Sequence, residues 1–76
     1  RIFPNPFLER AVLALPDDAP DGEYRLHLFD ATGRLLQTEA FRERQVEING
    51  EALPTGAMFW TVSSQGRIVA SGKVVR

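Results

Sequence analysis

Apolar residues recur at every second position along most of the 76-residue chain, and turn-forming residues interrupt the pattern roughly every 8–12 residues. The clearest segment is residues 24–29, where Tyr24, Leu26 and Leu28 occupy alternate positions. Similar segments cover residues 34–41, 45–48, 57–63 and 67–76. A period of two is typical of strands with one buried face. The spacing predicts an all-β fold, an immunoglobulin-like antiparallel β-sandwich of about seven short strands.

The start of the chain carries prolines that restrict its conformation. Pro4 and Pro6 flank Asn5 and predict an extended, turn-prone lead-in that is not helical. Residues 8–14 are compatible with a short helix. The alternation that ends at Pro16 favours a strand there instead.

Turn-forming residues separate the predicted strands. Asp30 and Gly33 stand at the first and fourth positions of a predicted type I turn, whose aspartate can accept the backbone N–H two residues on. Further loops or turns are predicted at residues 17–22, 49–50, 53–56 and 65–66. The glycines of the last two are Gly56 and Gly66.

Composition narrows the classes of function. The chain has no cysteine, which excludes disulfides, thiolate zinc sites and a cysteine nucleophile. Its net charge of −1 argues against nucleic acid as a partner. No apolar run approaches the roughly 18 residues of a membrane helix, so no membrane insertion is expected. The first residues do not form a signal peptide, and we expect a single domain over residues 1–76 that is a fragment of a larger secreted protein.

Reactive groups are few and poorly placed for catalysis. No serine lies in a G-x-S-x-G motif, and His27, the single histidine, is predicted on the outward face of a strand. Asp17, Asp18 and Asp21 could suggest calcium, but their spacing fits a solvated loop better. We therefore expect no catalytic residues, no metal and no cofactor.

Two segments leave alternatives open. Trp60 beside Phe59 could form a sugar-stacking platform, but core packing is favoured because so small a domain needs its large aromatics inside. The apolar run at residues 57–63 indicates burial on both faces, or one face against the core and one against a partner. The cations Arg67, Lys73 and Arg76 fit either an edge strand protected by charge or a strand presented to a receptor.

Four landmarks follow one another in a specific order. They are Pro4-Asn5-Pro6-Phe7, the segment LFDATGRLL at 28–36, Leu53-Pro54-Thr55-Gly56, and GRIV at 66–69 leading to GKVVR at 72–76. In these landmarks and their order, the whole chain resembles the type A C-terminal sorting domain of the type IX secretion system of the Bacteroidetes group. The resemblance implies a non-catalytic immunoglobulin-like domain fused behind a cargo protein that reaches the periplasm through an ordinary signal peptide. It also implies recognition by the outer-membrane secretion machinery, removal by a sortase-like cysteine protease, and a cargo that is secreted or held at the cell surface.

The resemblance assigns the recognition signal to the last five residues, which are Gly72, Lys73, Val74, Val75 and Arg76. We call these five residues the tail, and we expect their deletion to block export and leave most of the sandwich folded. Asp30, Gly33 and Gly56 would be structural marks of the family. The chain departs from the family pattern at Met58, where tyrosine is common, and at Gly72, where a basic residue is common, so Lys73 is the cation expected to matter. The competing interpretations are an accessory module that binds sugar or protein and a structural spacer in a multidomain protein.

Overall fold

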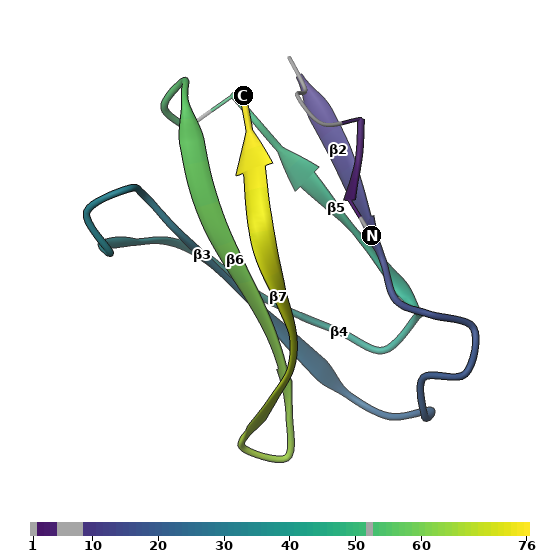
Figure 1. Ribbon diagram of the computed structural model, residues 1–76. Helices are drawn as coiled ribbons and strands as arrows, with labels where there is room; N and C mark the ends of the chain where they lie inside the picture. The colour runs from purple at the N-terminus through teal and green to yellow at the C-terminus, as the bar shows by residue number, and fades with distance from the viewer. Residues whose placement is uncertain (1, 5–8, 52) are drawn as a thin grey trace.

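A computed structural model describes residues 2–4, 9–51 and 53–76. The described part is all-β, with seven strands and no helix, arranged as two antiparallel sheets packed face to face (Figure 1). The strands are β1 (Ile2–Phe3), β2 (Arg10–Ala14), β3 (Tyr24–Phe29), β4 (Leu35–Phe41), β5 (Gln45–Asn49), β6 (Ala57–Ser64) and β7 (Arg67–Val75). The predicted β-sandwich is confirmed.

The two sheets have three and four strands. The order in the smaller sheet is β1-β2-β5, and the order in the larger sheet is β4-β3-β6-β7. The chain crosses between the sheets after β2, β4 and β5, as in an immunoglobulin-like sandwich. The last strand, β7, lies at the edge of the larger sheet, beside β6 (Figure 1), which confirms the edge position predicted for it.

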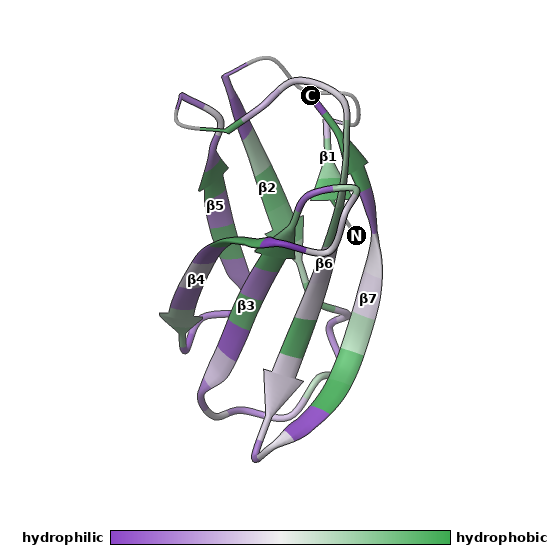
Figure 2. Ribbon diagram, turned by 90° about the vertical axis from the view of Figure 1, so that its left-hand side faces the viewer, coloured by the Kyte–Doolittle hydropathy of each residue, from purple (hydrophilic) through white to green (hydrophobic). Residues whose placement is uncertain are grey.

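The core follows directly from the alternation in the sequence, which Figure 2 shows as stripes along β3. Each strand turns every second side chain toward the facing sheet. Seven large side chains are fully buried: Leu13, Leu26, Leu28, Ile48, Met58, Val62 and Val74. Burial of each such side chain contributes about 1.5–3 kcal/mol.

Strand β6 settles two of the open alternatives. Trp60 is only 7% exposed and belongs to the core, which confirms the favoured prediction and rules out its indole as a sugar platform. Phe59 is 45% exposed on the opposite face, so the interpretation of β6 as buried on both faces is wrong. Met58 is fully buried and fills its position without a hydroxyl.

Residues 10–14 form a strand, as the alternation favoured, and the helical alternative is wrong where the structure describes the segment. Ala11 and Leu13 point into the core, and β2 pairs with β5 along its whole length. Beyond the end of β2, the Leu15 N–H donates to the Arg44 carbonyl at 2.8 Å and prolongs this pairing.

Candidate functional site

The tail is an integral part of the sandwich. In strand β7, Lys73 lies opposite Phe59 and Val74 opposite Met58. Past the end of the strand, Arg76 and Gly56 exchange two backbone hydrogen bonds of 3.0 Å each. The C-terminus is therefore held beside the start of β6 (Figure 1).

Alternate tail residues point in opposite directions, and two of them point inward. Val74 is fully buried in the core. Gly72 lies beneath the Trp60 indole, where a Cβ atom would come within 2.8 Å of Trp60 Cζ2 and 3.0 Å of Nε1. A side chain at position 72 would have to displace the indole ring, which gives a physical reason for glycine in place of a basic residue.

The other three tail residues have different roles. Lys73 is exposed and Val75 is half-buried, and both point to the outer face of the four-stranded sheet. The Arg76 guanidinium donates to the Leu53 carbonyl at 3.2 Å, so it fastens the connection between β5 and β6. Only Lys73 and Val75 thus display side chains of the tail on the outer face.

Lys73 ends a row of apolar side chains that crosses the outer face. Register places Leu35 of β4 beside Phe29 of β3, Phe29 beside Phe59 of β6, and Phe59 beside Lys73. Leu35 is 50% exposed, and the His27 ring stacks on Phe29 at 6.3 Å, which confirms the outward position predicted for His27. The row was not predicted from the sequence. Its sequence signal is an apolar residue at an outward position of several strands, but only the register shows that these positions are neighbours.

The turn at Asp30 is confirmed in detail. Asp30 Oδ1 accepts hydrogen bonds from the Thr32 N–H (2.9 Å), the Thr32 hydroxyl (2.7 Å) and the Arg34 N–H (2.9 Å). The Arg34 Nε lies 3.2 Å from Oδ2. The hydrogen bond from the Thr32 hydroxyl, followed by that from the Arg34 N–H, lowers the pKa of Asp30. The Gly33 N–H donates to the Asp30 carbonyl at 3.0 Å and closes the turn.

The hairpin between β6 and β7 turns on two residues. Gln65 has a φ of 53° and Gly66 a φ of 78°, which is the pair of positive φ values that a type I′ turn requires. Of the remaining structural marks, Gly56 has a φ of 106° and Pro4 is exposed, joined to Phe3 by a cis peptide bond. Asn5 and Pro6 lie outside the described residues.

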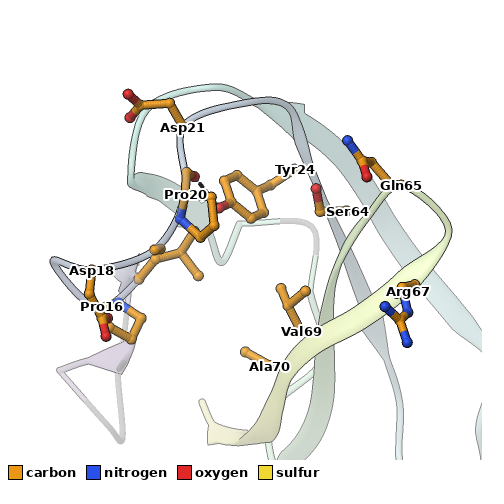
Figure 3. A pocket seen from close by; sticks show the side chains of 12 residues that line it. Pro16, Asp18, Pro20, Asp21, Tyr24, Ser64, Gln65, Arg67, Val69 and Ala70 are labelled. Atoms are coloured by element: carbon orange, nitrogen blue, oxygen red, sulfur yellow. Dashed lines mark hydrogen bonds between the residues drawn. The ribbon is translucent and has the colours of Figure 1, made fainter.

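A groove of about 510 Å³ lies between the loop before β3 and the β6–β7 hairpin (Figure 3). The Tyr24 hydroxyl donates to the Pro20 carbonyl and holds the loop over the sandwich. Arg44 donates to the Asp17 carbonyl at 2.9 Å and to Asp21 Oδ1 at 3.0 Å. Arg44 therefore binds the loop at residues 17–22, whose aspartates could have suggested a calcium site. Among the described residues, no three acidic or histidine side chains are grouped so that they could hold a metal ion.

Nothing in the described part of the chain has the length and apolar character of a membrane-crossing helix. No curated protein matches the chain. A family model described as "Secretion system C-terminal sorting domain" matches residues 1–76, which is the whole chain. The chain therefore belongs to the family of C-terminal sorting domains that mark proteins for the type IX secretion system.

Proposed function

We propose that the type IX machinery recognises this domain in its folded state and reads it at the last strand, with Lys73 and Val75 as direct contacts. The observation that carries the proposal is the alternation of the tail. Lys73 and Val75 are its two side chains on the outer face, whereas Val74 is fully buried and Gly72 packs beneath Trp60. An exposed side chain can bind a receptor without any unfolding of the domain.

The other three tail residues act indirectly in this proposal. Gly72 leaves room for Trp60, Val74 anchors the strand in the core, and Arg76 binds the Leu53 carbonyl. They hold Lys73 and Val75 in position. All five residues then matter for export, but only two of them touch the machinery.

The proposed role includes the fate of the protein that carries the domain. A cargo fused ahead of residue 1 passes from the periplasm across the outer membrane and is secreted or held at the cell surface. A sortase-like cysteine protease then removes the domain upstream of Arg1. Mass spectrometry of exported cargo tests this step, because a cargo whose C-terminus still carries residues 1–76 would contradict removal.

The test of recognition fuses a signal peptide and a fluorescent protein ahead of residue 1, in a host that has the secretion machinery. We expect export of the intact fusion and weaker export of Lys73→Gln and Val75→Ser. The matched control is Arg10→Gln, which removes an exposed cation from the other sheet. The proposal fails if the intact fusion stays in the periplasm while another cargo of the same machinery is exported.

A further inference from the structure

The outer face of the four-stranded sheet carries cations and no anion at its strand positions. Arg25 and Lys73 are exposed on it. All ten acidic residues of the chain lie in the described part, and none occupies a strand position of this face. They lie in loops and turns, on the inward side of β4 at Glu39, and on the other sheet at Glu47. The net charge of the chain is −1, whereas this face of the sheet is positively charged.

The acidic residues closest to this face along the chain flank β3. Asp30 follows the strand, but its carboxylate accepts three hydrogen bonds within its own turn and lies 3.2 Å from Arg34. Glu23 precedes the strand. The two carboxylates thus lie beyond the ends of β3, and none occupies a strand position of the face between Arg25 and Lys73.

One end of the face is apolar. Phe29, the last residue of β3, and Phe59 are cross-strand neighbours on the two inner strands, with Leu35 on one side and Lys73 on the other. The middle of the face, at His27 and Thr61, is polar. The Cβ atoms of directly opposite residues on neighbouring strands lie about 4.5–5.5 Å apart, so the side chains of this row form one continuous ridge. Aromatic side chains and arginine are enriched in protein interfaces relative to the rest of the surface, and a few such residues carry most of the binding energy.

We propose that this face docks on an acidic, partly apolar protein surface of the export machinery, with Phe59 as the apolar anchor and Arg25 and Lys73 as the charged contacts. The inference rests on the proposed function and extends the contact from the tail to residues of all four strands. A second copy of the domain does not fit as the occupant, because two such faces would bring like charges together. A face of four short strands makes a small interface, and small interfaces are transient, which suits a signal that has to be released.

The first experiment compares pairs of variants in the fluorescent fusion. Phe59→Ser is matched by Phe3→Ser, since these phenylalanines are 45% and 43% exposed on opposite sheets. Arg25→Glu is matched by Arg10→Glu, another exposed arginine on the other sheet. We expect Phe59→Ser and Arg25→Glu each to lower the exported fraction about tenfold, and the two controls to be exported like the wild type. Urea midpoints of the four variants verify that all of them are folded.

The second experiment identifies the class of the occupant. A photo-crosslinking amino acid is placed at Thr38 on the outer face and, as a control, at Val12 on the other sheet. We expect an adduct from position 38 alone that protease digests and that Lys73→Glu abolishes. A protease-resistant adduct would mean a glycan or lipid occupant and would overturn the assignment of a protein.

The outcomes separate the two proposals. If the wild-type fusion is not exported, the proposed function fails. If the wild type is exported and Phe59→Ser and Arg25→Glu are exported equally well, recognition by the tail survives and the docking face is refuted.

Discussion

Replacement of Gly72 by alanine tests the packing that holds the tail in place. At most positions with ordinary backbone angles, a change from glycine to alanine stabilises a protein by about 0.4–1 kcal/mol, because it restricts the unfolded chain. The backbone of Gly72 is not in the left-handed region, so this gain is available. The Trp60 ring opposes this gain, because it lies where the alanine side chain would be placed.

The steric cost follows from three distances. An added Cβ would lie 2.8 Å from Trp60 Cζ2, 3.0 Å from Cε2 and 3.0 Å from Nε1, whereas carbon atoms pack best at about 3.5–4.0 Å. Overpacking of this kind costs about 1–3 kcal/mol. Trp60 is only 7% exposed, so its indole cannot move away from position 72 without losing packing in the core. We therefore expect a net loss of about 1–2 kcal/mol in the free energy of unfolding, or roughly 4–16 °C in Tm.

Urea unfolding followed by far-UV circular dichroism measures this change in every variant, because Trp60 is the single tryptophan of the chain and the control removes it. The decisive control is a double-mutant cycle with Trp60→Phe, which removes Cζ2 and Nε1. In that background Gly72→Ala should be neutral or stabilising. A Gly72→Ala variant as stable as the wild type, or an equal loss in both backgrounds, would refute the steric explanation.

Three further predictions concern the tail and the turns. A chain that ends at residue 71 should lose its near-UV circular dichroism and its cooperative unfolding. The truncation removes the fully buried Val74 and the paired backbone of Arg76, so we no longer expect the truncated sandwich to stay folded; a cooperative melt would contradict this. Gln65→Asn should raise the free energy of unfolding, measured from urea curves, by about 0.5–1 kcal/mol, because asparagine tolerates the positive φ of this type I′ turn better than glutamine. An unchanged free energy of unfolding would mean that the turn does not limit stability. Asp30 has a lowered pKa in the folded state, so its charge stabilises the domain above the unfolded pKa near 3.9, and this contribution is lost as the pH falls through the lower folded pKa. Unfolding curves of the wild type and Asp30→Asn should therefore converge at low pH, and a constant difference down to pH 2 would contradict the shift.

Much of the fold could be predicted from local pattern. The alternation of Tyr24, Leu26 and Leu28 assigns a strand and its buried face, because side chains of a strand point alternately to its two sides. The turns at Asp30 and at residues 65–66 follow from side-chain capping and from positive φ, and both depend only on residues within the turn. The landmarks that resemble the sorting-domain family are likewise a property of the linear chain, and the family match confirms them.

Only the tertiary structure decides which residues share a surface. The sequence treats Gly72, Lys73, Val74, Val75 and Arg76 as one contiguous signal, whereas the sandwich buries Val74, packs Gly72 under Trp60 and leaves Lys73 and Val75 on the outer face. Leu35, Phe29, Phe59 and Lys73 become neighbours through the register of three strand pairs. Register and sheet order depend on contacts between residues far apart in the chain, which no local pattern contains. The sequence by itself therefore determined the strands, the turns and the family, and the packing of the two sheets decided which side chains of the signal a receptor can touch.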